Sequence, residues 1–335
     1  MKLLILTQVI DNQDPVLGFF CEWVREFARQ YEHVTVICLK KGNHDLPENV
    51  TVLSLGKESG VSRFKYAYRF YRYIWQYRKQ YDKVFIHMNQ IYAILGGLCW
   101  RMMGKKVGLW YAHGKVPFSL RIANLFVTHA FASTARGYGI VTHKLHIIGQ
   151  GIDTDTFVPQ ERYNKYELLT VGRISPVKRI DTIIDAFIEV QKKFPQASLS
   201  IIGAAGLPGH KIYEENLKKK VEKNNLTEVV HFVGPVQHAA LPGYISKAHV
   251  FVNMSNTGSL DKAILEALSC GVPVVSSNES FKTMIPNPKY HAHNEHELAE
   301  RITQLFSLND RPSLREVVIE QHSLPALIEK IKHVL

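Results

Sequence analysis

The stretch ELLTVGRISPVKRIDTIIDAFIEVQKKFPQASLSIIG, residues 167–203, decides the fold. Its two ends, ELLTVG and SLSIIG, are short aliphatic runs that are typical of buried strands. Between them, a polar loop leads into a segment that places five apolar side chains on one helical face: Ile180, Ile183, Ile184, Phe187 and Phe194. Strand, helix and strand in this order predict a β-α-β unit with parallel strands.

The N-terminal part of the chain shows the same pattern. KLLILT, residues 2–7, is typical of a buried strand, and HVTVICL, residues 33–39, predicts a second one. The segment between them has helical spacing of its aromatic residues Phe20, Trp23, Phe27 and Tyr31. Because each half of the chain opens with a β-α-β unit, we expect an α/β protein with two Rossmann-like domains and parallel sheets.

A polar, proline-containing stretch, residues 155–167, is the expected connection between the two domains. We therefore place the domains at 1–160 and 161–322. A C-terminal helix over about 323–335 is expected to pack back on the first domain. In sheets of this kind ligands bind at the carboxyl ends of the strands, so the loops that follow the strands are the first places to search for a site.

Composition narrows the class of protein and of partner. The chain has 335 residues, 46% of them hydrophobic and 21% charged, with a formal net charge of +11 and a pI near 9.3. These fractions are typical of a globular protein. The positive balance favours anionic partners, namely nucleic acid, nucleotide phosphates or an acidic membrane surface, unless the extra cations simply form a solvated surface.

The cysteines and the lengths of the apolar runs indicate the cellular compartment of the protein. The four cysteines are scattered without a CxxC pair, which disfavours a zinc site or a disulfide framework and fits a reducing cytosol. Polar residues interrupt the N-terminal run MKLLILTQVID too early for a signal peptide, and no apolar run has the length of a transmembrane helix. We expect a cytoplasmic protein that meets a membrane, if at all, on its inner surface.

The loop after the strand ELLTVG carries two cations. Arg173 and Lys178 lie five residues apart, and Pro176 prevents regular helix between them, so the loop can turn both side chains toward one point. A forked guanidinium and a compact ammonium group together suit a pyrophosphate. The alternative is a basic loop that only faces solvent.

A second candidate is SNTGSLDKAILEALSCGVPVVSS, residues 255–277, in which a glycine-serine turn precedes a helix. Backbone N–H groups near Gly258, Ser259 and Leu260 are predicted to be free for an anion at the helix start. Glu266, further along the helix, could accept two hydrogen bonds from a ribose diol, or could be an exposed helix glutamate. The alternative interpretation of Asp261 is an N-cap, which is the commonest use of aspartate at the start of a helix.

Several of these segments, taken together, resemble one family. VGRISPVKRIDTIIDAF, SLSIIG, HFVGPV, LDKAILEALSCGVPVVSS and IIGQGIDTDTFVP look like the retaining, nucleotide-sugar-dependent glycosyltransferases of family 4. The resemblance is densest over 145–280 and reaches the first half weakly through YAHG. It implies the GT-B fold, in which the second domain binds most of the donor and the first domain most of the acceptor.

The resemblance assigns roles to individual residues. Arg173 and Lys178 match the pair that grips the donor diphosphate, and Glu266 matches the later glutamate of the family's E-x7-E motif, which binds the ribose. His113 matches a histidine near the donor sugar, and Gly18 lies in the N-terminal loop that closes over the phosphates. Val233, Gly234 and Pro235 match the strand end near the base, where contacts are often through backbone. Gly172 and Gly203 are two further expected donor-binding residues.

One departure from the family pattern concerns the sugar. The earlier glutamate of E-x7-E would fall at Gly258, which has no carboxylate. Asp261 is the nearest replacement, and we hypothesise that it contacts the donor sugar. Lys262 could add a phosphate contact, or could be an exposed helix lysine.

The segment 63–81, RFKYAYRFYRYIWQYRKQY, is dense in aromatic and cationic residues. On a helix, such a composition suits contact with anionic lipid or with a lipid-linked acceptor. A core helix whose cations extend to solvent is the alternative. Nucleic acid is a weaker alternative, because none of its fold signatures is present, and we expect no nucleic-acid partner.

The expected function is transfer of a hexose from a UDP- or GDP-linked sugar to a glycan or lipid-linked acceptor, in cell-envelope polysaccharide or glycolipid synthesis. The resemblance implies no cofactor and no metal. It also implies that the acceptor hydroxyl attacks the donor sugar on the same face from which the leaving phosphate departs. His113 would then orient the sugar, and His87 could face the acceptor. Two alternatives stay open: another GT-B enzyme such as a nucleotide-sugar epimerase, and a non-catalytic nucleotide-sugar-binding protein.

Overall fold

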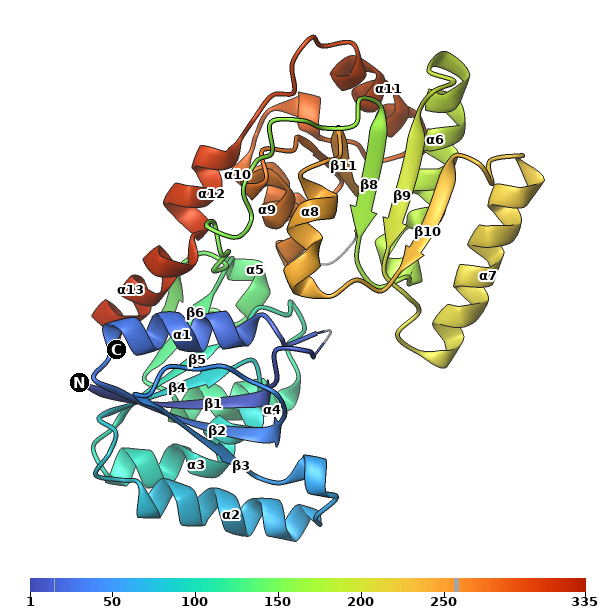
Figure 1. Ribbon diagram of the computed structural model, residues 1–335. Helices are drawn as coiled ribbons and strands as arrows, with labels where there is room; N and C mark the ends of the chain where they lie inside the picture. Colours follow the sequence, from blue (N-terminus) through green and yellow to red (C-terminus); the bar gives the residue numbers. More distant parts are fainter. Residues whose placement is uncertain (15, 256–258) are drawn as a thin grey trace. The chain divides into compact units, whose positions relative to one another are not determined.

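The computed structural model describes residues 1–14, 16–255 and 259–335, and the chain divides into two compact units. Unit 1 comprises Met1–Gly151 together with His322–Leu335, and unit 2 comprises Ile152–Gln321. Each unit is a parallel sheet with helices on its faces (Figure 1). The prediction of two α/β domains with parallel sheets is confirmed.

Unit 1 contains a seven-stranded parallel sheet in its described residues, with the strand order β3-β2-β1-β4-β5-β6-β7. The strands are β1 Lys2–Ile10, β2 His33–Lys41, β3 Val50–Ser54, β4 Lys83–His87, β5 Lys106–Trp110, β6 His129–Ala132 and β7 Leu145–Ile147. The register pairs Leu3 of β1 with Val34 of β2 and with Lys83 of β4. The order reverses at β1, so the ends of β1 and β4 form the switch point at which such sheets bind ligands.

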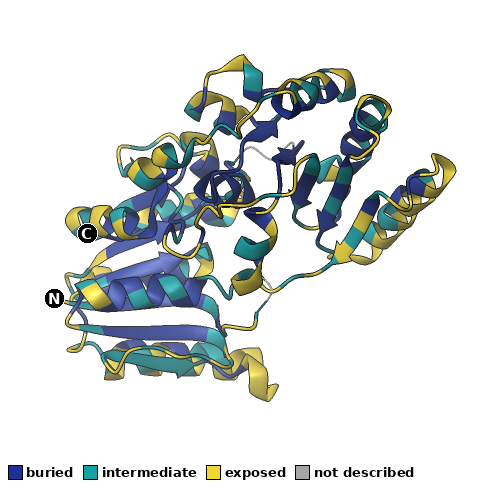
Figure 2. Ribbon diagram, turned by 45° about the horizontal axis from the view of Figure 1, so that its top comes forward, coloured by how far each residue is buried: buried dark blue, intermediate teal, exposed yellow. Residues whose placement is uncertain are grey.

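The two faces of this sheet belong to two different hydrophobic clusters. Leu3 and Ile5 point to one cluster and Leu4 and Leu6 to the other, as the two-residue period of a strand requires. Helix α1 (Phe20–Gln30) and the C-terminal helix α13 (Leu324–Val334) cover the first face. The helices α2 (Arg63–Gln76), α3 (Gln90–Met102) and α4 (Phe118–Phe126) cover the second, and the short α5 spans Ala135–Tyr138. Figure 2 shows the centre of the sheet buried, the edge strand β3 partly buried, and the helices exposed on their outer sides.

Unit 2 contains a five-stranded parallel sheet in its described residues, ordered β10-β9-β8-β11-β12. The strands are β8 Glu167–Val171, β9 Ser198–Ile202, β10 Val230–Gly234, β11 Val250–Asn253 and β12 Val274–Ser276. The helices are α6 Ile180–Lys193, α7 Pro208–Lys223, α8 Leu241–Ile245, α9 Lys262–Ser269, α10 Glu279–Met284, α11 Glu295–Phe306 and α12 Arg315–His322. The order reverses at β8, so the loops after β8 and β11 meet at the switch point of this sheet.

The connection between the units lies earlier than the expected residue 160. The segment that follows Gly151 packs in unit 2, since Ile152 and Phe157 belong to its hydrophobic core. Arg315 also holds this segment, because its guanidinium donates to the carbonyls of Thr154 (2.7 Å) and Phe157 (2.6 Å). At the other end of the chain, α13 contributes Leu327 and other side chains to the core of unit 1 beside α1.

Candidate donor-binding site

The ends of strands β8, β9 and β10 lie so close together that only glycine fits at the central position, 203. Gly172 donates its N–H to Ile202 (2.9 Å), and Gly203 donates to Gly234 (2.9 Å). A Cβ atom built on Gly203 would lie 1.9 Å from the carbonyl oxygen of Gly172, and the φ angle of Gly203 is +136°. Glycine at 203 therefore lets two strand ends approach closely at the ligand edge of the sheet.

The loop after β8 brings both predicted cations to one small pocket. Residues Pro176–Lys178 form one turn of 3-10 helix, which carries the Lys178 side chain back over Gly172. Arg173 is exposed, and its guanidinium forms no hydrogen bond within the described residues. The pocket is lined by Thr170, Val171, Gly172, Arg173, Lys178, Ile180, Ile201, Ile202 and Asn253. The loop thus brings both cations to one pocket, Arg173 exposed and Lys178 partly buried, and the pyrophosphate assignment stays a prediction.

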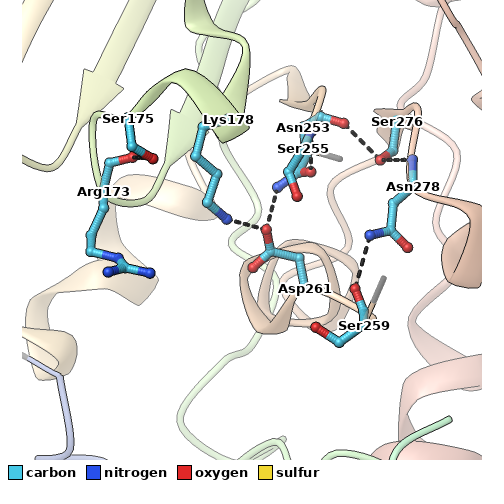
Figure 3. A network of polar contacts seen from close by, with 9 residues as sticks. All are labelled: Arg173, Ser175, Lys178, Asn253, Ser255, Ser259, Asp261, Ser276 and Asn278. Carbon is cyan, nitrogen blue, oxygen red and sulfur yellow. Dashed lines mark hydrogen bonds and ion pairs between the residues drawn. The ribbon is translucent and has the colours of Figure 1, made fainter. Parts of the chain in front are cut away.

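Lys178 forms an ion pair with Asp261, the residue that precedes α9 (Figure 3). Asp261 stands at the N-cap position, but its side chain forms no capping hydrogen bond. Its carboxylate instead accepts from Lys178 and from the side-chain amide of Asn253 (3.0 Å). The N-cap alternative is therefore wrong for this side chain. Burial would raise the pKa of Asp261, but the charge of Lys178 and these hydrogen bonds hold that pKa below its usual value.

Asn253 and Asn278 hold the described ends of the turn that leads into α9 (Figure 3). The side-chain oxygen of Asn253 accepts the N–H of Ser255 (3.1 Å), and its carbonyl accepts the hydroxyl of Ser276 (2.7 Å). Asn278 donates its amide to the carbonyl of Ser259 (2.9 Å). Leu260 is buried at 3% exposure, which anchors the turn in the core. Gly258, the departure from the family motif, lies outside the described residues.

Glu266 lies one turn into α9 and is only 4% exposed, so the alternative of an exposed helix glutamate is wrong. Its carboxylate contacts His238 Nε2 (2.8 Å) and Lys262 Nζ (3.2 Å). Burial would raise the pKa of Glu266, but the Lys262 charge and the His238 hydrogen bond lower it. Burial also lowers the pKa of Lys262, despite the opposing charge of Glu266. The Lys262 side chain is 23% exposed, so it is not the exposed helix lysine that was the alternative to a phosphate contact.

Sequence reasoning missed the partners of these charged residues. His238 follows β10 in a 3-10 turn, His238–Ala240, and its ring lies 5.3 Å from that of Phe157. Asn253 is the last residue of β11 and is 2% exposed. A polar residue that ends an aliphatic strand at the ligand edge is a signal that could have identified Asn253. No comparable local signal identifies His238, because its contact with Glu266 joins segments that are distant in the sequence.

Three predicted contacts near the base lie at the end of β10. Val233 is 38% exposed, Gly234 ends the strand and Pro235 follows it, also exposed. The predicted site residues of unit 2 that the structure describes therefore all lie at one edge of its sheet. They are Gly172, Arg173, Lys178, Gly203, Val233, Gly234, Pro235, Ser259, Leu260, Asp261, Lys262 and Glu266. This edge can offer cations, backbone amides and a buried carboxylate to one elongated anion.

The other predicted residues lie in unit 1. Gly18 donates its N–H to the carbonyl of Asp14 (3.0 Å) in the loop before α1. His113 is exposed after β5, with its backbone N–H bonded to Gly137 (3.1 Å). His87 is 2% exposed and stacks on Phe20, with ring centroids 4.0 Å apart. His87 is therefore a buried packing residue, and the expectation that it faces an acceptor is not supported by its surroundings.

Metal-ligand clusters and membrane-spanning helices are both absent from the described ranges. Within these ranges, no group of three or more His, Cys, Asp or Glu side chains is placed to hold a metal ion. In the same part of the chain, no helix combines the length and the apolar character needed to cross a bilayer.

Comparison with known proteins gives the family. The profile of the family described as "Glycosyl transferases group 1" matches residues 151–322, slightly more than half of the chain. The chain therefore belongs to this family, the retaining GT-B glycosyltransferases that its sequence resembles. The matched range contains the pocket of Arg173 and Lys178 and all of α9.

Among curated proteins, the chain is similar to a phosphatidylinositol N-acetylglucosaminyltransferase subunit from Arabidopsis thaliana, with 30% identity over 142 residues, 42% of this chain and 30% of that protein. It is also similar to "D-inositol 3-phosphate glycosyltransferase 2" of Catenulispora acidiphila, with 28% identity over 155 residues, 42% of this chain and 36% of that protein. The aligned segment thus spans about a third of the length of these relatives.

Solved structures share the fold over the whole chain. The crystal structure of Anabaena Alr3699/HepE in complex with UDP matches with a TM-score of 0.79, 17% identity and 99% coverage of both chains. The apo form of the lipopolysaccharide outer core galactosyltransferase WaaB matches with a TM-score of 0.68, 14% identity, and coverage of 100% of this chain and 99% of that chain. These likenesses show the GT-B fold.

Proposed function

We propose that this protein transfers a hexose from a nucleotide diphosphate sugar to a glycan or lipid-linked acceptor, without a metal, in cell-envelope polysaccharide or glycolipid synthesis at the cytoplasmic face of the membrane. The family supports transfer from an activated sugar. The names of the relatives support the acceptor class, since they include phosphatidylinositol, inositol phosphate and lipopolysaccharide. The Anabaena complexes with UDP and UDP-glucose support a uridine donor.

The pocket between Arg173 and Lys178 carries the proposal. Arg173 is an exposed guanidinium without a described hydrogen-bond partner, which leaves its forked donors available for a diphosphate. Lys178 lines the same pocket. Both cations attract the diphosphate more strongly as its negative charge grows in the transition state, so they stabilise the leaving group.

Glu266 and its neighbours fit the ribose. The carboxylate is ionised, because Lys262 and His238 lower its pKa, and an ionised carboxylate accepts two hydrogen bonds from a vicinal diol. The same contacts orient its oxygens before a ligand arrives. The base then lies toward Val233, Gly234 and Pro235, where the exposed end of β10 offers backbone groups.

Asp261 takes the place of the missing carboxylate at Gly258 in this proposal. It is ionised, it lies beside the diphosphate lysine, and Asn253 fixes its position through a hydrogen bond. An acidic oxygen next to the diphosphate site can accept a hydroxyl of the donor sugar. His113, from unit 1, orients the sugar, and the departing phosphate oxygen takes the acceptor proton.

Ligand-induced thermal stabilisation tests the donor assignment. UDP, GDP and their sugars are added to the wild-type protein, and a ligand at a hundred times its Kd stabilises the folded state by about 2.7 kcal/mol. The stabilising donor is then incubated with candidate lipid and glycan acceptors while nucleoside diphosphate release is recorded. Acceptor-dependent release supports a transferase. Sugar isomerisation without acceptor would indicate an epimerase, and binding without either reaction would indicate a binding protein.

A further inference from the structure

Helix α2 of unit 1 exposes a stripe of aromatic side chains. Phe64, Tyr68, Tyr71 and Trp75 follow one another at intervals of four, three and four residues, which places them on one face of the helix. Their exposed fractions are 90%, 65%, 42% and 61%. The buried side chains of the same helix are Phe70 and Ile74. The exposed stripe is therefore separate from the side chains of α2 that are buried in the core.

Helix α3 carries a matching aliphatic stripe. Ile91, Leu95, Leu98 and Met102 have the same four-three-four spacing, and each is at least 37% exposed. The two helices lie side by side, since the Tyr71 hydroxyl donates to the carbonyl of Leu95 (3.1 Å) and Phe70 stacks on Tyr92 (5.9 Å). A shallow apolar pocket opens between them and is lined by Tyr71, Ile74, Trp75, Arg78, Cys99, Met102 and Met103. We call the eight exposed side chains of the two stripes the α2–α3 surface.

Exposed cations accompany the apolar stripes, and the two helices themselves carry no acidic residue. Neither α2 nor α3 contains Asp or Glu, and the exposed cations on or next to the two helices are Arg63, Lys65, Arg72, Lys79 and Arg101. Arg78 lies 4.5 Å from the ring of Trp75. Eight exposed apolar side chains, on two helices that carry exposed cations and no carboxylate, match a partner that is apolar inside and anionic at its surface.

We propose that the α2–α3 surface docks on an anionic lipid bilayer. Tyrosine and tryptophan favour the level of the lipid headgroups, and aliphatic side chains beside them reach the first acyl carbons. The exposed arginines and lysines meet lipid phosphates, each contributing about 1 kcal/mol near an anionic surface. A second copy of the chain fits this surface less well, because it would bring two sets of like charges together. The inference does not depend on the proposed transfer reaction.

Tryptophan fluorescence tests the docking directly. The chain has four tryptophans, all within the described ranges, and Trp23, Trp100 and Trp110 are at most 2% exposed. Trp75 is the exposed one, at 61%. We expect a blue shift of the emission when vesicles of equal parts phosphatidylcholine and phosphatidylglycerol are added, and quenching when the lipids carry bromine. The variant Trp75→Phe should show neither change while still sedimenting with the vesicles.

Matched variants separate the apolar and the electrostatic contributions. Phe64→Ser combined with Leu98→Ser removes one apolar side chain from each stripe, 90% and 58% exposed, and we expect at least tenfold weaker sedimentation with the anionic vesicles. Arg63→Gln, Lys65→Gln and Arg72→Gln together should weaken it similarly and remove most of its salt dependence. The control, Lys211→Gln, Lys219→Gln and Lys223→Gln on α7, loses the same charge and should bind as the wild type does.

Three outcomes would overturn the proposal. One is equal binding of phosphatidylcholine and mixed vesicles, and another is equal weakening by the α7 control. The third is a Trp75 blue shift that follows protein concentration without lipid, together with a dimer in analytical ultracentrifugation, which would assign the surface to a second copy. Failure of donor binding leaves these results unaffected, so the two proposals fail separately.

Discussion

The carboxylate of Asp261 neutralises the ammonium group of Lys178, and both side chains are less than a fifth exposed, at 16% and 17%. The contact joins the loop after β8 to the residue before α9, at the switch point of the unit 2 sheet. Lys178 therefore has a counter-charge before a diphosphate arrives. Under the proposed function, a donor diphosphate shares this lysine with Asp261, and we expect that competition to weaken its binding.

Asp261→Asn should bind UDP or GDP about tenfold more tightly than the wild type. The substitution keeps the shape and removes a negative charge beside the incoming diphosphate, and a tenfold change corresponds to about 1.4 kcal/mol. Transfer should nevertheless slow, because the amide cannot replace the carboxylate toward the sugar. Isothermal titration with nucleotide and a transfer assay measure the two effects. Asp185→Asn, which removes a carboxylate paired with Lys220, is the control, and unchanged nucleotide affinity in Asp261→Asn would refute the competition.

Arg173→Ala and Lys178→Ala should both reduce transfer by orders of magnitude, but only one should affect folding. Arg173 is exposed and forms no described hydrogen bond, so its loss should change the free energy of unfolding by less than about 0.5 kcal/mol. Lys178→Ala leaves the Asp261 carboxylate without its cation and should cost about 1–3 kcal/mol. Urea unfolding in the absence of nucleotide measures both. Equal stability of the two variants would show that the ion pair contributes nothing to folding.

The fold could be predicted from the sequence because each strand and helix has its own local pattern of apolar residues. The stretch 167–203 contains complete β8, α6 and β9, and each has a continuous aliphatic run or a helical apolar face. The helix ends at Lys193, one residue before Phe194, which was expected on its apolar face. Local pattern fails at α2, whose aromatic residues occur on all sides. Only the structure shows that Phe70 and Ile74 face the core and that Phe64 and Trp75 do not.

The sequence pointed to the charged residues of the candidate site but not to the contacts between them. Arg173, Lys178 and Glu266 were predicted from loop position and resemblance. The N-cap alternative for Asp261 followed from local preference, whereas a lysine 83 residues away takes its carboxylate. His238 reaches Glu266 across 28 residues of sequence. Contacts of this kind depend on which strand ends are neighbours, and no spacing within one segment encodes that order.

Gly203→Ala should severely destabilise unit 2, because the new methyl group would lie 1.9 Å from the carbonyl oxygen of Gly172. Gly234→Ala is the matched comparison: its Cβ meets nothing within 4 Å, although its φ of +83° is unfavourable for alanine. We expect a loss of about 1–2 kcal/mol for Gly234→Ala and at least about 3 kcal/mol for Gly203→Ala. Gly209→Ala, in the first turn of α7 with open space around it, should be neutral. Thermal melts of the three variants give the order.

Unit 2 should lose stability as the pH falls from about 6.5 to about 4, because of His249. This side chain is fully buried, its Nδ1 accepts the N–H of Tyr166 (3.2 Å), and its ring stacks on Phe306 (4.9 Å). Burial, and then the charges of Arg311 and Lys165, lower its pKa from 6.5 to about 4. In that range the unfolded chain binds a proton that the folded chain does not, so unfolding becomes more favourable as the pH drops, by at most about 3 kcal/mol.

His249→Asn isolates this contribution, since the asparagine oxygen can still accept from Tyr166 while the titrating group is gone. Urea unfolding of the wild type and the variant at several pH values between about 6.5 and about 4 measures the slope, which should be shallower in His249→Asn whatever its stability near neutral pH. His231→Asn, a change at an exposed position on β10, should keep the wild-type slope. An unchanged slope in His249→Asn would mean that the buried imidazole is protonated in the folded protein as readily as in the unfolded chain.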